Sequence, residues 1–362
     1  MIKLLVVDDS PLMRRLLTEI FSAAGDFEVA VARTGAEALD LLTAFAPDVV
    51  TLDIHMPGMD GLACLDQIML IRPCPVVMVS SLTAEGADET LEAMALGAVD
   101  FIAKPRGAVS LEIDALAPEL VDKVRQAASA RISRATRLRE RVRARTGGAM
   151  ARPVPRPRAA QRISVPRGPL PADGLVLVGC STGGPPALDA LLGRLAADFP
   201  WPIVVAQHMP ASFTGPLARR LDRLCALGVS EVVKATPLHP GQVYIARGDA
   251  DILITRRAGL LTAIAAPSDP ELYWHPSVDR LVSSAMAQVA PESLVGVLMT
   301  GMGADGARAM TELRTRGGHT IAESVDTAVV WGMPGALVAA DGASVVAPLD
   351  RIAGELMALF KA

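Results

Sequence analysis

Short apolar runs alternate with longer amphipathic stretches over the first 125 residues. The runs are rich in β-branched residues and are LLVV at 4–7, FEVAVA at 27–32, VVTL at 49–52, VVMVS at 76–80 and FIA at 101–103. The stretches between them, such as PLMRRLLTEIFSAAG and GAEALDLLTAFAP, place apolar residues at i, i+3 and i+4 and end at Gly or Pro, which predicts helices. This alternation predicts a doubly wound α/β domain whose parallel sheet is covered on both faces.

A second α/β pattern occupies residues 171–362. Its strand-like runs are LVLV at 175–178, PIVVA at 202–206, VYIA at 243–246, DILIT at 251–255, LLTAIAA at 260–266, LVGVLM at 294–299, TIAE at 320–323 and SVVA at 344–347. The three central runs lie close together around an Arg-Ala-Gly sequence, which predicts a local antiparallel hairpin. The others alternate with helical stretches, so we expect a second doubly wound parallel sheet.

The segment between the two patterns has a different composition. Residues 131–168 hold 12 arginines and one glutamate, and the later part is rich in proline and poor in large apolar residues. Such a segment cannot bury a core, so we expect a basic linker over 126–170 between domains at 1–125 and 171–362. A basic run can bind nucleic acid. However, no aromatic residues interleave the arginines, and the second half lacks a compact helix-turn-helix pattern, so we expect no nucleic-acid partner.

Charge and residue usage argue against a disulfide-stabilised, zinc-binding or membrane-spanning protein. The net charge is −4, and residues 1–130 carry 20 acidic against 9 basic residues. The four cysteines form no C-x-x-C pair and the five histidines lack metal-ligand spacing, which argues against a disulfide framework and a zinc site. No apolar run approaches the roughly 18–20 residues that cross a bilayer, and the N-terminus is too short for a secretory signal. We therefore expect a cytoplasmic protein without direct membrane insertion.

Five polar residues mark the carboxyl ends of the predicted N-terminal strands. Asp8 and Asp9 follow the first strand, Asp53 the third, Ser80 the fourth and Lys104 the fifth. Ligands bind at this edge of an open parallel sheet, where three converging carboxylates need a divalent cation such as Mg²⁺. The lysine and the hydroxyl suit a phosphoryl group. One such aspartate would be explained as a helix cap, but the full set predicts phosphoryl transfer to an aspartate.

LVVDDS, TLDIHMPGMDG, VVMVSS and FIAKP resemble the response-regulator receiver domain over residues 1–125. The resemblance implies a flavodoxin-like fold in which Asp53 is phosphorylated. The implied magnesium ligands are Asp8, Asp9, Asp53 and the backbone carbonyl of His55. The implied switch residues are Ser80 and Lys104, which sense the phosphoryl group, and the aromatic Phe101.

One alternative for the second half is a dinucleotide site. Gly301, Gly303 and Gly306 form G-x-G-x-x-G after a strand, and Glu323 ends the next strand near the spacing expected of a ribose-binding acid. Only 56 residues follow Gly306, however, which is too few for the rest of a dinucleotide domain. The motif also leaves the serine motif of this half unexplained.

That motif is G-x-S-x-G at 179–183, which places Ser181 on a sharp turn between a strand and a helix. His208 and Asp305 also follow predicted strands, so all three residues can meet at one sheet edge as nucleophile, base and orienting acid. Their order, Ser, His, Asp, differs from that of the α/β-hydrolase fold, which makes an ordinary esterase scaffold unsuitable. Cys180, one residue from the apex, competes as a nucleophile, but we expect it to point inward and to pack.

GCSTGGPPAL, QHMPASFT, LHPGQVYIARGD, HPSVD and MTGMGADG resemble the catalytic domain of the CheB-type chemotaxis protein-glutamate methylesterases over about residues 171–357. The resemblance implies a triad of Ser181, His208 and Asp305, with Thr182 and Met302 bordering the oxyanion and the base. No cofactor is implied for this domain. The long arginine- and proline-rich linker is the one departure that we find.

Together the two resemblances imply a serine hydrolase that phosphorylation activates. Its substrates would be glutamate methyl esters of methyl-accepting chemotaxis receptors, with release of methanol, and receptor glutamines, which it would deamidate. A chemotaxis histidine kinase would be the phosphodonor. The alternatives of a different class are a non-catalytic receiver-linked scaffold and an arginine-tethered nucleic-acid binder.

Overall fold

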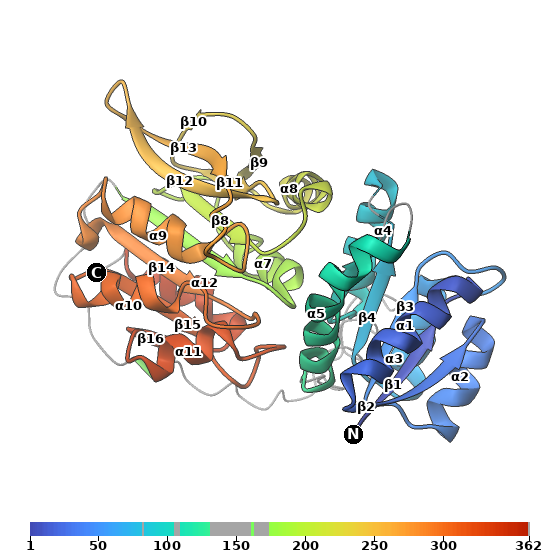
Figure 1. Ribbon diagram of the computed structural model, residues 1–362. Helices are drawn as coiled ribbons and strands as arrows, with labels where there is room; N and C mark the ends of the chain where they lie inside the picture. Colours follow the sequence, from blue (N-terminus) through green and yellow to red (C-terminus); the bar gives the residue numbers. More distant parts are fainter. Residues whose placement is uncertain (82, 105–108, 131–160, 163–173, 361–362) are drawn as a thin grey trace. The chain divides into compact units, whose positions relative to one another are not determined.

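The computed structural model describes residues 1–81, 83–104, 109–130, 161–162 and 174–360. The described residues form two compact units, one within residues 1–155 and one within 156–362 (Figure 1). Most of the predicted linker, 131–160 and 163–170, lies outside the described residues. Within the remainder of it, a helix continues to Ala128 and a two-residue strand lies at Gln161–Arg162.

The N-terminal unit alternates strands and helices as its hydrophobic pattern predicts. Its elements are β1 (Ile2–Val7), α1 (Pro11–Ala24), β2 (Phe27–Ala32), α2 (Gly35–Ala44), β3 (Val49–Asp53), α3 (Gly61–Ile71), β4 (Val76–Ser80), α4 (Ala84–Leu96), β5 (Asp100–Ala103) and α5 (Val109–Ala128). All strand pairs are parallel, in the order β2-β1-β3-β4-β5. This is the flavodoxin-like order, whose switch point lies between β1 and β3. The predicted parallel sheet and fold are confirmed.

The C-terminal unit is built on a larger sheet. Its elements are β6 (Gln161–Arg162), β7 (Leu175–Cys180), α7 (Gly184–Leu192), β8 (Ile203–Gln207), α8 (Ala211–Leu224), β9 (Gly228–Val232), β10 (Thr236–Pro237), β11 (Gln242–Ala246), β12 (Ala250–Arg257), β13 (Leu260–Pro267), α9 (Val278–Met286), a 3₁₀ turn (Pro291–Ser293), β14 (Leu294–Leu298), α10 (Ala307–Thr315), β15 (His319–Glu323), α11 (Met333–Ala339), β16 (Val345–Ala347) and α12 (Leu349–Ala358). None of the described helices is long and apolar enough to cross a membrane.

The main sheet of this unit runs β6-β16-β15-β14-β7-β8-β11-β9. Only β6 is antiparallel in it, against β16. Strand order reverses beside β7, because the chain proceeds through β8 to one side and later returns to β14 on the other. Ligand sites of such sheets lie at the carboxyl ends of the strands at this point.

The predicted hairpin is confirmed for β12 and β13, which pair antiparallel across a turn at Ala258–Gly259. Both turn residues have positive φ, as the twist of a tight hairpin requires. The grouping of 243–246 with that hairpin was wrong, since β11 pairs in parallel with β8 and β9 and belongs to the main sheet. Proximity in sequence suggested the pairing, whereas the apolar β11 is buried between two parallel neighbours.

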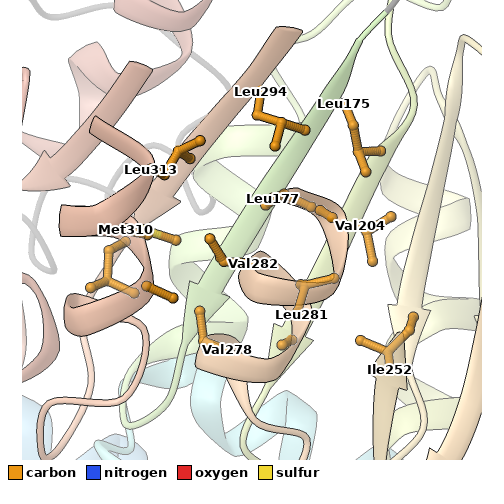
Figure 2. Close-up of a cluster of buried hydrophobic side chains, with 14 of the residues drawn as sticks. Leu175, Leu177, Val204, Ile252, Val278, Leu281, Val282, Leu294, Met310 and Leu313 are labelled. Atoms are coloured by element: carbon orange, nitrogen blue, oxygen red, sulfur yellow. The ribbon is translucent and has the colours of Figure 1, made fainter. Parts of the chain in front are cut away.

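Helix α9 is fixed on the sheet by its apolar face. Val278, Leu281, Val282 and Ala285 recur at i, i+3, i+4 and i+7, and all are fully buried in the cluster of Figure 2. Burying each leucine or valine contributes about 2 kcal/mol relative to leaving it exposed. Since Val278 also packs against Gly179 of β7, the first turn of α9 is held over the carboxyl end of that strand.

Candidate active site

The carboxylates of Asp8, Asp9 and Asp53 meet at the edge of the N-terminal sheet, with ligand atoms within 4.8 Å of one another. Lys104 Nζ lies 2.8 Å from Asp53 Oδ2 and 3.3 Å from Asp8 Oδ2. Burial and the neighbouring charge of Asp53 raise the pKa of Asp8, although Lys104 opposes this. Three carboxylates against one ammonium leave negative charge uncompensated, and oxygen donors suit Mg²⁺. The residues therefore fit the predicted cation.

The other predicted receiver residues surround this cluster. Ser80 ends β4, is buried, and its hydroxyl accepts a hydrogen bond from Thr90 Oγ1 at 2.8 Å. Phe101 is buried in β5. The backbone N–H of His55 donates to Asp53 Oδ1 at 3.3 Å, while its exposed imidazole pairs with Glu89. The structure thus brings the backbone of His55, and not its side chain, to Asp53.

In the C-terminal unit, Ser181 and His208 lie beside each other because of the pairing of β7 and β8. The register joins Cys180 to Gln207, and the backbone N–H of His208 donates to the Cys180 carbonyl at 3.1 Å. Ser181 directly follows β7 and His208 directly follows β8. The two residues are therefore neighbours, about one strand spacing apart. Gly183 takes φ +77° after the serine and is the N-cap of α7, so the turn leads directly into a helix N-terminus.

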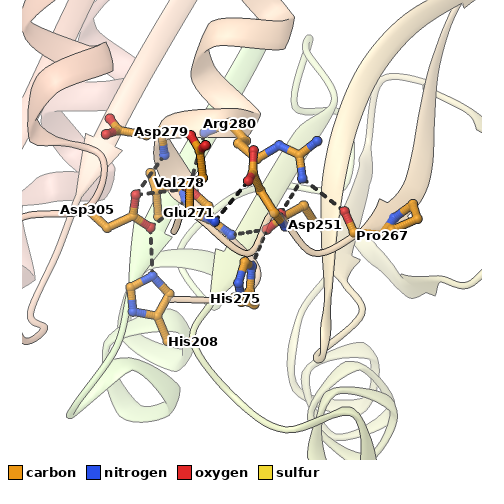
Figure 3. A network of polar contacts seen from close by, with 11 residues as sticks. His208, Asp251, Pro267, Glu271, His275, Val278, Asp279, Arg280 and Asp305 are labelled. Atoms are coloured by element: carbon orange, nitrogen blue, oxygen red, sulfur yellow. Dashed lines mark hydrogen bonds and ion pairs between the residues drawn. The ribbon is translucent and has the colours of Figure 1, made fainter. Parts of the chain in front are cut away.

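His208 is held through one ring nitrogen and is free at the other. Its Nε2 lies 2.9 Å from Asp305 Oδ2 (Figure 3). Nδ1 is buried and has no hydrogen-bond partner among the described residues. An anionic Asp305 selects the tautomer with the proton on Nε2, which leaves the Nδ1 lone pair available as a base.

Asp305 in turn accepts hydrogen bonds from the first turn of α9. The backbone N–H of Val278 donates to Oδ2 at 2.7 Å, and that of Asp279 donates to Oδ1 at 3.0 Å. The Ser277 hydroxyl also donates to Oδ1. Burial favours the neutral acid, but the hydrogen bonds and charge of His208 and the two amides lower the pKa of Asp305 below its ordinary value. Asp305 therefore stays ionised beside the imidazole.

A second buried carboxylate, Asp251 on β12, holds the segment that leads into α9. It accepts the backbone N–H of Ser277 at 2.6 Å and lies 3.0 Å from His275 Nδ1 and 2.5 Å from Arg280 (Figure 3). Ser277 then bonds Asp305. A chain of contacts thus connects the hairpin with Asp305, and the pattern of hydrophobic positions did not indicate it.

Gln207 connects the backbones of Ser181 and His208. Its Nε2 donates to the carbonyls of Ser181 and His208, each at 3.0 Å, while its Oε1 accepts from Cys180 Sγ at 3.1 Å. A side chain at position 184 would overlap this amide, since an added Cβ would lie 1.8 Å from Oε1, so Gly184 is required there. Sequence reasoning missed Gln207; its place directly before the histidine, at the end of a buried strand, was the available signal.

Cys180 is fully buried, and burial raises the pKa of its thiol far above the ordinary value. Its Sγ points to the Gln207 amide. A buried neutral thiol is a poor nucleophile, so this geometry agrees with the expectation that Cys180 packs.

The loop after β14 lies against the serine. A Cβ on Gly301 would be 2.8 Å from Ser181 Cβ. The backbone N–H of Ser181 donates to the Thr300 carbonyl at 3.0 Å, and Thr300 Oγ1 donates to the Thr182 carbonyl at 2.8 Å. Thr182 and the buried Met302 therefore belong to two segments that meet at Ser181, and their role as the border of the site stays a prediction.

Glu323 ends β15 in a fully buried position behind this loop. Its carboxylate accepts the Thr300 N–H at 2.8 Å and the Thr327 hydroxyl at 2.9 Å. Burial raises the pKa of Glu323 to about 7, against the effect of these hydrogen bonds. A carboxylate that is enclosed in this way is not available to a ribose hydroxyl, which argues against a dinucleotide site.

We expect Glu323→Gln to stabilise the C-terminal unit at pH 8 by about 3 kcal/mol. The folded state holds the Glu323 proton more tightly than the unfolded state, so its contribution is full below pH 4.5, falls as the pH rises towards 7, and stays lost above. Glutamine keeps an uncharged acceptor for the Thr300 N–H, and its NH₂ takes the place of the oxygen that faces Thr327, whose hydroxyl can turn to accept from it. Calorimetric unfolding of both proteins from pH 4.5 to 8.5 checks this; curves that run parallel across the range would contradict it.

Comparisons with known proteins show which families the two units resemble. The family model for the CheB methylesterase matches residues 176–356, and the model for the response regulator receiver domain matches 4–113. "Protein-glutamate methylesterase/protein-glutamine glutaminase 2" of Rhodopseudomonas palustris is 55% identical over 99% of this chain and 98% of its own length. "Protein-glutamate methylesterase/protein-glutamine glutaminase 3" of Rhodospirillum rubrum is 54% identical over 99% and 96%.

A solved structure resembles the C-terminal part. The crystal structure of the Thermotoga maritima CheB methylesterase catalytic domain has 36% sequence identity and a TM-score of 0.50, and it covers 52% of this chain and all of its own. Both matched family models lie in the order that the motifs predict, with the receiver first. The chain therefore belongs to the CheB methylesterase family, in the form that carries a response-regulator receiver domain ahead of the methylesterase domain.

Proposed function

We propose that this protein is a protein-glutamate methylesterase and protein-glutamine glutaminase, and that Ser181, His208 and Asp305 are its catalytic triad. Methyl-accepting chemotaxis receptors are the proposed substrates. The names of relatives that match over nearly the full length support the activity. The observation that carries the triad is the imidazole of His208, which is hydrogen-bonded to Asp305 through Nε2, has no partner at Nδ1 among the described residues, and belongs to a residue that adjoins Ser181 across the paired ends of β7 and β8.

The proposed reaction begins when His208 Nδ1 takes the Ser181 hydroxyl proton and Oγ attacks the γ-ester carbonyl. The imidazolium returns the proton to the departing methoxide, and methanol leaves. Water then adds to the acyl-enzyme with His208 again as base, which releases glutamate and free serine. Backbone N–H groups of the segments that contain Thr182 and Met302 are the proposed donors to the oxyanion. With a glutamine substrate, ammonia is the leaving group.

The N-terminal unit is proposed to control this reaction through phosphorylation of Asp53 by a chemotaxis histidine kinase. Asp8, Asp9 and Asp53, with the His55 carbonyl, would hold Mg²⁺, which when bound offsets the charge of the transferred phosphoryl group. Lys104 already contacts two of these carboxylates, so it is placed to pair with a phosphoryl oxygen on Asp53. Ser80 and Phe101 are the proposed switch residues.

The deciding experiment measures methanol release from methylated receptor, with and without acetyl phosphate and Mg²⁺. We expect turnover that rises about tenfold or more on phosphorylation. Asp53→Asn removes the nucleophilic carboxylate oxygen, so we expect its rate not to respond to the phosphodonor. An equal response of the variant would refute the switch. Salt-sensitive DNA binding without methanol release would instead favour a nucleic-acid binder.

A further inference from the structure

We propose that Trp274 is a positioning residue that holds the imidazole of His208 and stabilises its protonated form; this inference rests on the proposed function. The indole and imidazole rings are stacked, with planes 3° apart and centroids 5.3 Å apart. The His208 side chain is only 4% exposed. One face of the base is therefore covered by an aromatic surface.

The indole is itself held in place from two sides. Tyr273 packs edge-on against it, with centroids 4.7 Å apart and an interplanar angle of 83°. On another side lies Gly303, where an added Cβ would be 3.1 Å from Trp274 Nε1 and where φ is +71°. A side chain at position 303 would be strained and would crowd the indole. The glycine of the loop after β14 thus makes room for the tryptophan.

This stack has two consequences for the base. It restrains rotation of the ring, so that Nε2 stays on Asp305 and Nδ1 stays free to act as the base. It also places the electron-rich indole face over the cation that forms when His208 takes the serine proton, an attraction worth more in a desolvated site. The charged group nearest the ring is Asp305, which is hydrogen-bonded to Nε2 at the ring edge, and next to Asp305 lies Asp279, which pairs with Arg308 at 3.2 Å.

The first test is optical and needs no substrate. A protonated imidazole in contact with an indole quenches its fluorescence, so we expect tryptophan emission of the full chain to fall as His208 becomes protonated. His208→Gln and Trp274→Phe should each abolish this titration, and the matched control Trp331→Phe should keep it. A titration that survives Trp274→Phe would overturn the proposal.

The second test is kinetic and compares Trp274→Leu with Trp274→Phe. We expect the leucine variant to lower kcat for methanol release about tenfold with little change in KM, and to move the acid limb of the pH–rate profile about half a pH unit lower. Phenylalanine should restore most of the rate, since it keeps an aromatic face. A leucine variant with an unchanged limb would overturn the proposal. Failure of the wild type to release methanol would refute the proposed function. The optical titration would still show whether Trp274 contacts the protonated imidazole of His208.

Discussion

Ser181→Ala is expected to lower the rate of methanol release about a millionfold, to the background of the assay. The change removes only the hydroxyl. The backbone hydrogen bonds of the residue, to Thr300 and from Gly184 and Gln207, remain, and the small side chain still fits against Gly301. We therefore expect unfolding midpoints close to those of the wild type. The measurement is methanol released from methylated receptor under phosphorylating conditions.

The matched control is the neighbouring residue. Cys180→Ser keeps a donor to Gln207 Oε1 and alters a group that the proposed reaction does not use. This variant should stay within about tenfold of the wild type, because subtle changes of packing are worth about 1 kcal/mol. Substantial turnover by Ser181→Ala, or loss of all activity in Cys180→Ser alone, would reverse the assignment of the nucleophile.

Asp305→Asn is expected to lower kcat by about three to four orders of magnitude. The amide NH₂ that replaces one carboxylate oxygen faces a donor whichever way it turns, because Oδ1 accepts from Asp279 and Ser277 and Oδ2 from Val278 and His208. If the NH₂ faces the imidazole, it selects the tautomer with the proton on Nδ1, which cannot take the serine proton. Kinetics with receptor substrate measure the loss.

A stability control separates the change of the His208 tautomer from a loss of the hydrogen bonds that hold Asp305 against the start of α9. Asp305→Asn also sets an amide donor against a helix N-terminus, so thermal unfolding should fall by several degrees. Ser277→Ala removes one donor to the same carboxylate without changing the tautomer, and it should be destabilised as well but lose far less activity. Equal losses of activity in the two variants would mean that Asp305 acts only by holding the loop.

Much of this architecture was predictable because hydrophobic periodicity is a local property. All five N-terminal strands lie where short apolar runs occur, and the strand-to-helix turns place Asp53 and Ser181 at the sheet edges. The hairpin turn at Arg257–Leu260 was predictable for the same reason, because a tight turn with positive φ depends on the few residues that form it. β9, with its half-exposed residues, gave too weak a pattern to be recognised.

The contacts that complete the site were not predictable, because they join residues far apart in the chain. In the sequence, Gln207 is indistinguishable from any other strand residue. Its two carbonyl partners, on Ser181 and His208, can be identified only once the register of β7 and β8 is known. Trp274 lies in a segment without periodicity, and its ring partner is 66 residues earlier. Glu323 fitted a ribose-binding acid by spacing alone, whereas burial assigns its carboxylate to Thr300.

The contacts from Asp251 through Ser277 to Asp305 limit which parts of the C-terminal unit can be deleted without loss of activity. The hairpin of β12 and β13 stands apart from the main sheet and invites deletion in the construction of a minimal catalytic fragment. Yet Asp251 belongs to that hairpin, and without it the segment before α9 loses its buried anchor. A fragment shortened there would retain Ser181, His208 and Asp305, the three residues of the proposed triad, while losing the support that Ser277 gives to Asp305.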